Sequence, residues 1–253
     1  MIQKIPESKP RTTRRSKSRP APNRIAKGDA VSANHQKLTE RDAQIKELGY
    51  DFAAGIKFVL DQALPLDGSA LEIGTGKGRF MVALAPCVKT ITTVDISAEE
   101  QHYARLNACY AGVKTKIKYV LQDAARLSWP GQTFDAVVTM NAMHHIPHFN
   151  QVLEEMLRVV KPGGKIVLAD FSPRGFQIMA RFHRAEGGTH ERHIHNFRDI
   201  QNLLRERGWV TRLRKGCLQE VLVAWRTGAA SNPNHSREKN RNFSSKPSTH
   251  KKS

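Results

Sequence analysis

The stretch ALEIGTGKGRF, residues Ala70–Phe80, is the most informative part of the sequence. Three glycines at alternate positions, Gly74, Gly76 and Gly78, directly follow a short apolar run. The run predicts a buried strand, and the segment RFMVALA after the glycines predicts a helix. Glycine has no Cβ, so a turn of glycines lets the backbone approach a ligand closely. The stretch therefore predicts a ligand-binding turn between a strand and a helix.

Two common ligand classes do not fit this turn. A nucleotide P-loop requires Gly-Lys-Ser/Thr, but Lys77 is followed by Gly78. A dinucleotide fold requires GxGxxG, and Arg79 stands where the last of these glycines would be. The turn must then be interpreted together with the segments around it.

The chain alternates between strand-like and helix-like segments, which indicates a parallel sheet covered by helices on both faces. The last two strand-like segments are joined directly by a Gly-containing turn and predict an antiparallel hairpin. We therefore predict an α/β, Rossmann-like fold with a seven-stranded, mostly parallel sheet and a C-terminal antiparallel hairpin. The predicted strands are 70–74, 90–95, 116–122, 134–140, 165–171, 209–216 and 217–225.

The helices have recognisable boundaries. Thr39 with Asp42 resembles an N-terminal cap for one helix that runs until Pro65. Ser97 and Glu100 form a capping box for a second helix. The stretch 171–195, after the fifth strand, is less regular, and we expect it to cover the substrate.

Basic residues concentrate at the two ends of the chain, whose formal net charge is +18. Residues 1–36 hold nine Lys/Arg and two acids, and 226–253 hold seven and one. Both ends have few apolar residues, so we expect disordered basic tails at 1–36 and 227–253 around one domain, 37–226. Such tails favour weak, nonspecific contact with nucleic acid.

The remaining composition indicates a cytoplasmic protein. The three cysteines form no CxxC pair, which argues against a disulfide framework or a zinc site. No apolar run approaches the ~20 residues of a membrane span, and the N-terminus lacks the apolar segment of a secretory signal. We expect no membrane span and no metal.

Five motifs in order resemble the class I S-adenosylmethionine-dependent methyltransferase superfamily, over about residues 38–225. The motifs are LEIGTGKG, VDIS, LQDAARL, FDAVVTMNAMHHI and LRVVKPGGKIVLADF. Within the superfamily, these motifs resemble those of the subgroup that includes the ubiquinone/menaquinone-biosynthesis methyltransferases. The resemblance implies S-adenosyl-L-methionine as cofactor.

The resemblance also implies positions for the cofactor-binding residues. Glu72 would lie near the ammonium end of the cofactor, Asp95 would accept from the ribose hydroxyls and Ile96 would cover the adenine. Asp123 would accept from the adenine amino group, close to the amide of Ala124. The full predicted cofactor set is Glu72, Gly74, Thr75, Gly76, Gly78, Asp95, Ile96, Asp123, Ala124 and Asn141.

Methyl transfer requires alignment, exclusion of water and, for some acceptors, removal of a proton. His144 and His145 follow the fourth strand and are the candidate catalytic residues, as a general base. His148, Arg181 and His183 are the candidate substrate-pocket residues.

Three functions remain open. We expect a methyltransferase acting by in-line transfer on a small molecule, because the Asn/Asp-Pro-Pro-Tyr signature and a dedicated RNA-binding module are both missing. The alternative is an RNA or protein methyltransferase whose tails hold a polymer. A silent S-adenosylmethionine-binding module is the third possibility.

Overall fold

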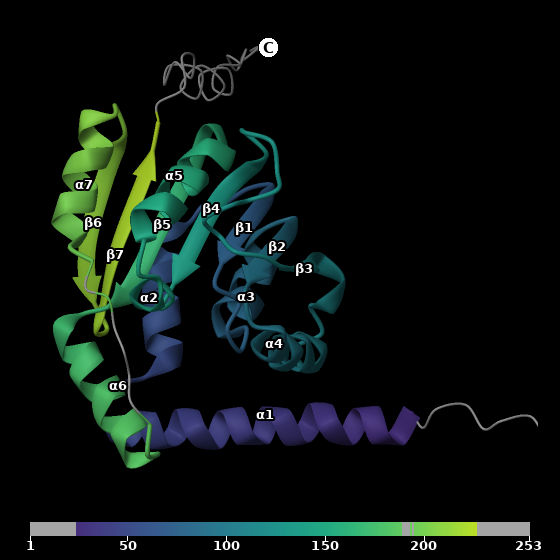
Figure 1. Cartoon of the computed structure of the whole chain (residues 1–253). Helices are drawn as coiled ribbons and strands as arrows, with labels where there is room; N and C mark the ends of the chain where they lie inside the picture. The colour runs from purple at the N-terminus through teal and green to yellow at the C-terminus, as the bar shows by residue number, and fades with distance from the viewer. Residues whose placement is uncertain (1–23, 189–192, 194, 227–253) are drawn as a thin grey trace, which may run out of the picture.

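The computed structural model describes residues 24–188, 193 and 195–226. Within them, seven strands form one sheet in the order β3-β2-β1-β4-β5-β7-β6 (Figure 1). The pairs from β3 to β5 are parallel, and β7 runs antiparallel to both β5 and β6. The predicted fold class is confirmed. The strands are β1 Ser69–Ile73, β2 Thr90–Asp95, β3 Ile117–Leu121, β4 Phe134–Met140, β5 Val160–Phe171, β6 Val210–Gly216 and β7 Gln219–Trp225.

The strand β5 begins earlier than the predicted 165. Val160 pairs with Phe134, and the register then shifts so that Lys165 pairs with Ala136. The four residues between them contain the Pro-Gly-Gly turn that we took as the gap between helix and strand.

The helices are α1 Arg24–Glu47, α2 Phe52–Ala63, α3 Arg79–Leu84, α4 Ala98–Tyr110, α5 Phe149–Val159, α6 Pro173–Ala185 and α7 Phe197–Glu206. Helices α2, α3 and α4 cover one face of the sheet, and α5 and α7 cover the other (Figure 1). Three short 3-10 turns, η1 Ala85–Cys87, η2 Lys114–Lys116 and η3 Met143–His145, complete the elements of the described residues.

The N-terminal helix corrects two predictions. It begins at Arg24, so residues 24–36 are helical, whereas we expected a disordered tail up to 36. Thr39 is not a cap, because it lies inside α1 and its hydroxyl donates to the carbonyl of His35 at 2.9 Å. The predicted single helix is two, and Asp51 caps the second by accepting from the amide of Ala54 at 3.1 Å. Residues 1–23 and 227–253 lie outside the described part of the chain.

The less regular stretch after β5 is largely helical. Helix α6 begins directly after its N-cap residue Ser172, whose hydroxyl accepts from the amide of Gly175 at 3.3 Å. Its apolar positions recur with helical spacing and are buried at Gly175, Met179 and Phe182. We missed this helix because the arginines and histidines between these positions obscured the periodicity.

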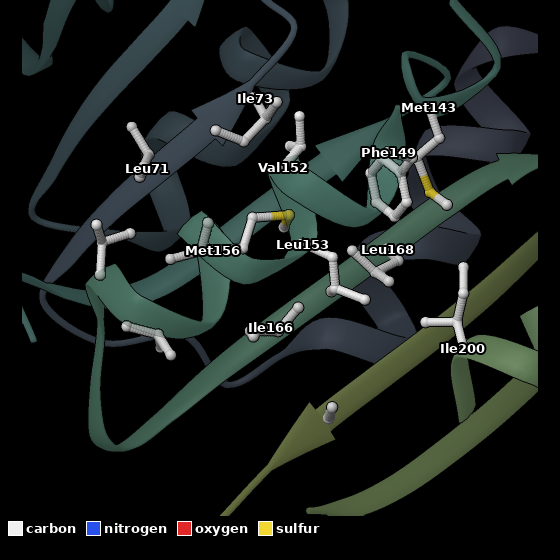
Figure 2. Close-up of a cluster of buried hydrophobic side chains, with 14 of the residues drawn as sticks. Leu71, Ile73, Met143, Phe149, Val152, Leu153, Met156, Ile166, Leu168 and Ile200 are labelled. Carbon is white, nitrogen blue, oxygen red and sulfur yellow. The ribbon is translucent and has the colours of Figure 1, made fainter. Parts of the chain in front are cut away.

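The core has two main parts, one on each face of the sheet. In the part drawn in Figure 2, α5 presents Phe149, Val152, Leu153 and Met156 to β1, β4 and β5. These residues recur at helical spacing, so one stripe of the helix is buried. Burial of this stripe fixes α5 and thereby the loop between β4 and α5.

A smaller third cluster lies at the carboxyl ends of the parallel strands. Ile45 of α1, Tyr50 and Phe171 pack there against Met179 and Phe182 of α6. Helix α1 passes across this end of the molecule below the strands, with α6 at one end of it (Figure 1). Both helices therefore frame the edge of the sheet where ligands bind in open α/β folds.

Candidate active site

A cavity of about 720 Å³ opens at the carboxyl ends of the parallel strands. It is bordered by the glycine-rich turn after β1, the ends of β2 and β3, and the loop between β4 and α5. Helices α1, α2 and α6 contribute Arg41, Phe52, Ile56 and His183 from the other side. The volume and position suit a cofactor together with a small acceptor.

The three positions of the turn require glycine for different physical reasons. Each has a positive φ, which favours glycine. A Cβ on Gly74 would lie 2.4 Å from Cβ of Ala142, and one on Gly78 would lie 3.0 Å from Cβ of Ala104. Only a Cβ on Gly76 would enter open space. Packing of the chain against itself therefore requires two of the glycines, and close approach of a ligand concerns Gly76.

Asp95 and Ile96 end the strand β2 at the cavity. The Asp95 carboxylate accepts from the amide of Gly76 at 2.9 Å and from the amide of Ser97 at 2.9 Å. Each carboxylate oxygen keeps further accepting capacity, which fits a pair of ribose hydroxyls. Ile96 is 78% exposed, which suits a side chain that covers a flat ring.

Asp123 and Ala124 follow β3 and also border the cavity. The Asp123 carboxylate accepts from the amide of Ala125 at 2.9 Å, which fixes the turn. The residue is exposed, so this carboxylate can also accept from a ligand amino group.

Glu72 is only 1% exposed and lies beneath the turn. Thr93 donates to its carboxyl at 2.6 Å, and the hydroxyls of Thr93 and Thr75 lie 2.7 Å apart. Burial raises the pKa of Glu72 to about 8, although the Thr93 hydrogen bond opposes the shift. A cation beside Glu72, such as an ammonium group, would favour its ionised form.

Asn141 follows β4 with φ 54° and contributes to the cavity. Its side-chain oxygen is buried and accepts no hydrogen bond from the described residues. Such an atom needs a partner, and a ligand in the cavity can supply it. Together with the Gly76 cradle and the carboxylates, this acceptor makes the residues fit S-adenosylmethionine.

His144 is 2% exposed and borders the cavity beside the predicted cofactor residues. Its Nδ1 lies 2.7 Å from Oδ1 of Asp170, at the end of β5. The other oxygen of Asp170 accepts from the backbone amide of His144 at 3.0 Å. Asp170 therefore fixes the position of the imidazole and favours the tautomer with the proton on Nδ1.

The other histidines have separate positions. His145 and His148 are exposed and border the cavity. His195 lies with Nε2 3.0 Å and 3.1 Å from the carbonyls of Met143 and Ile146, so it supports the loop that carries His144. Among the described residues, no group of His, Cys, Asp and Glu could hold a metal ion.

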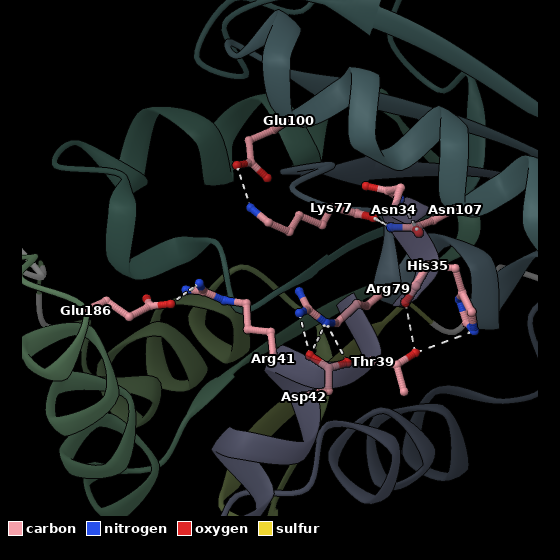
Figure 3. A network of polar contacts seen from close by, with 10 residues as sticks. All are labelled: Asn34, His35, Thr39, Arg41, Asp42, Lys77, Arg79, Glu100, Asn107 and Glu186. Carbon is pink, nitrogen blue, oxygen red and sulfur yellow. Dashed lines mark hydrogen bonds and ion pairs between the residues drawn. The ribbon is translucent and has the colours of Figure 1, made fainter. Parts of the chain in front are cut away.

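Helix α1 is held over the cavity by ion pairs at both sides (Figure 3). Arg79, next to the glycine-rich turn, donates from Nε to both carboxylate oxygens of Asp42 on α1 at 3.0 Å. Arg41 of α1 pairs with Glu186 after α6 and lies over the Phe182 ring at 4.7 Å. The helix thus connects the cofactor turn to α6.

The structure brings nearly all predicted site residues to one cavity. Arg181 is the exception, because it lies on the exposed side of α6 and does not border the cavity. The arginine that borders the cavity near α6 is instead Arg41 of α1. The lining includes Glu72, Gly74, Thr75, Gly76, Gly78, Asp95, Ile96, Asp123, Ala124, Asn141, His144, His145, His148 and His183.

Two residues of the site were missed from the sequence. Asp170 had a signal, since an acid ends the apolar strand LADF at the ligand edge of the sheet. Arg41 had none, because its partner Glu186 is 145 residues away and the contact depends on how α1 packs.

Comparison with known proteins agrees with this geometry. A family model described as a methyltransferase domain matches residues 71–168, the part that carries the glycine-rich turn, Asp95 and the His144 loop. The chain contains a class I S-adenosylmethionine-dependent methyltransferase domain. S-adenosylmethionine is the cofactor of this domain.

Relatives of the methyltransferase domain include small-molecule enzymes. The 27-O-demethylrifamycin SV methyltransferase of Amycolatopsis mediterranei is 29% identical over 67% of this chain and 68% of its own length. The ubiquinone biosynthesis O-methyltransferase of Sodalis glossinidius is 30% identical over 57% of each chain. The chain thus spans about two thirds or less of these relatives.

A solved structure shares the fold of this methyltransferase. A putative S-adenosylmethionine-dependent methyltransferase from Methanococcus maripaludis matches with a TM-score of 0.57 and 19% identity, covering 81% of this chain and 94% of the other. Within the described residues, no helix is long and apolar enough to cross a membrane.

Proposed function

We propose that the protein transfers the methyl group of S-adenosylmethionine to a hydroxyl oxygen of a small molecule, with His144 as general base. The buried His144–Asp170 pair beside the cofactor residues carries this proposal. The names of the two relatives, both O-methyltransferases, support the same acceptor class.

Each cofactor residue has a proposed task. Asp95 would hold the ribose, with Ile96 over the adenine and Asp123 at its amino group. Glu72 would lie near the ammonium group, and Asn141 would offer its unpaired oxygen. When bound, S-adenosylmethionine supplies an electrophilic methyl carbon on a sulfonium, so the protein needs no nucleophile of its own.

His144 would remove the proton of the acceptor. With Nδ1–H donating to Asp170, Nε2 accepts the hydroxyl proton as the oxygen forms its bond to carbon. Asp170 does not take the proton but stabilises the imidazolium that forms. The bases His145 and His148 lie at the exposed rim, where solvent reaches them.

The test replaces His144 by Gln and measures transfer from labelled cofactor to a panel of phenols and alcohols by mass spectrometry. We expect kcat to fall about 10²- to 10⁴-fold, the usual contribution of a general base. Affinity for S-adenosylhomocysteine should stay within about threefold, since no contact to the cofactor is removed. His145→Gln is the matched control and should retain most activity.

The shape of the pH profile separates a base from a structural histidine. The pH dependence of kcat in the wild type should be lost in His144→Gln. A His144→Gln protein with kcat within twofold of wild type would overturn the assignment.

A further inference from the structure

Two basic side chains from different helices, an arginine and a histidine, meet at the side of the cavity away from the glycine-rich turn. Arg41 comes from α1 and His183 from α6, and both border the cavity. Glu186 lies outside the lining and contacts both, by an ion pair with Arg41 and with its Oε2 3.8 Å from Nδ1 of His183. The carboxylate thus joins the two side chains at the rim.

The charges of the cavity are divided between its two sides. Its acids are Glu72, Asp95, Glu100 and Asp123, which lie at the glycine-rich turn, the strand ends and the start of α4. The described lining residues of α1 and α6 include no acid. Lys77 and Arg79 at the glycine-rich turn are paired with Glu100 and Asp42, so an anionic group would meet its strongest attraction beside Arg41.

The other lining cations have partners at close range. Nζ of Lys77 lies 3.0 Å from Oε1 of Glu100, and Arg79 donates to Asp42 from both Nε and Nη2. Arg41 differs, because only its Nη1 pairs with Glu186 and its Nε and Nη2 donate to none of the described residues (Figure 3). A planar guanidinium with unused donors suits a carboxylate or phosphate.

The environment of His183 points to the same ligand charge. Burial lowers the pKa of His183, and the positive charge of Arg41 lowers it further. Glu186 acts in the opposite direction. A ligand anion here would compensate the Arg41 charge and favour the protonated imidazole.

Apolar side chains also border the cavity on the helices α1, α2 and α6. Ile45, Phe52 and Met179 border the cavity nearby, on the same helices or next to them. An acceptor bound here would place an apolar or aromatic body against them and its hydroxyl toward His144.

We propose that Arg41 and His183 form a subsite for a carboxylate or phosphate group of the acceptor, and that Glu186 competes with this group for Arg41. This inference rests on the proposed function and narrows it to hydroxylated acceptors that bear an acidic group. The ligand anion forms the hydrogen bonds that Nε and Nη2 of Arg41 leave unmade.

Binding of small probes tests the subsite without knowledge of the acceptor. Benzoate, phenyl phosphate and the neutral benzamide are titrated into protein saturated with S-adenosylhomocysteine, and affinities are measured by NMR. We expect at least one anion to bind about tenfold or more tightly than benzamide. The stronger anion identifies the group that the subsite takes.

Matched variants assign the preference to residues. Arg41→Gln and His183→Gln should each lower the ratio of anion to benzamide affinity at least threefold. Arg181→Gln is the control, since Arg181 is on the same helix but on its exposed side. Glu186→Gln should increase anion affinity several-fold and leave benzamide unchanged, whereas a purely structural Glu186 would weaken both probes together and overturn the competition.

Other outcomes decide against the subsite without affecting the proposed function. Equal affinity for anions and benzamide in the wild type, with normal S-adenosylhomocysteine binding, would overturn the subsite but leave the role of His144 intact. If Arg41→Gln lowered S-adenosylhomocysteine affinity more than tenfold and kept the probe ratio, Arg41 would serve the carboxylate of the cofactor instead. Thermal unfolding of each variant verifies that it is folded.

Discussion

Glu72 is a carboxyl group that the fold places where it is difficult to ionise. It lies beneath the glycine-rich turn, and hydroxyls of Thr93 and Thr75 connect it to that turn. Its pKa of about 8 arises chiefly from burial. This buried carboxyl group can therefore change its charge near neutral pH, and its protonation becomes linked to stability.

The free energy of unfolding should fall as pH rises through the Glu72 titration. Between pH 4.5 and about 8, the folded protein holds a proton that the unfolded chain has released. Glu72→Gln removes this difference in bound protons. The free energy of unfolding of the variant, relative to that of the wild type, should therefore rise by up to about 1.4 kcal/mol per pH unit in that window. Urea titrations at several pH values measure it. Exposed Glu47→Gln is the control, and a flat difference for Glu72→Gln would contradict the raised pKa.

At the scale of elements, helix α1 covers the cavity at the carboxyl ends of the parallel strands. It contacts α4 through Asn34 and Asn107 at 2.7 Å and through stacked rings of His35 and Tyr110. Its other end contributes Ile45 to the cluster at the strand ends. The helix therefore depends on packing along its length, as expected for an element with few apolar residues of its own.

Weakening the contact between α1 and the turn should make cofactor exchange faster. Asp42→Asn removes the charge that Arg79 contacts, and we expect S-adenosylhomocysteine to dissociate about three- to tenfold faster. Stopped-flow displacement measures the rate. The control is Asp61→Asn, which removes an exposed ion pair with Lys57 on α2. Equal rates in both variants would show that α1 does not limit exchange.

At the scale of the whole molecule, the excess positive charge and the candidate active site lie in different parts of the sequence. The formal net charge is +18, and residues 1–23 and 227–253 carry 13 of the 41 Lys/Arg residues but two of the 23 acids. The cavity and all the side chains assigned to it lie within residues 24–226. If the acceptor is the small molecule proposed above, we expect residues 24–226 to suffice for the reaction.

A chain of residues 24–226 should retain methyl transfer to a small acceptor within about twofold. Its affinity for a polyanion such as heparin should fall, because most of the excess charge is removed. A chain that begins at 37 should unfold at a lower temperature, since it lacks Asn34 and His35 of α1. Loss of activity in the 24–226 chain would favour the polymeric-substrate alternative.

The sequence by itself determined the mostly parallel sheet and the positions of the turns at its ligand edge. Apolar runs separated by helices predict parallel strands. The glycine-rich turn follows β1, Asp95 ends β2 and Asp123 lies shortly after β3. These features are local, because a residue that ends a parallel strand is carried to the ligand edge by the strand itself.

Only the tertiary structure decided the acceptor side. The Asp170–His144 pair joins β5 to the loop after β4, and Arg41 reaches Glu186 across 145 residues of chain. The sequence suggested Arg181, but the rotation of α6 exposes that residue, while the packing of α1 places Arg41 at the cavity. Helix rotation and docking depend on burial of apolar faces against distant elements, and no local pattern encodes those contacts.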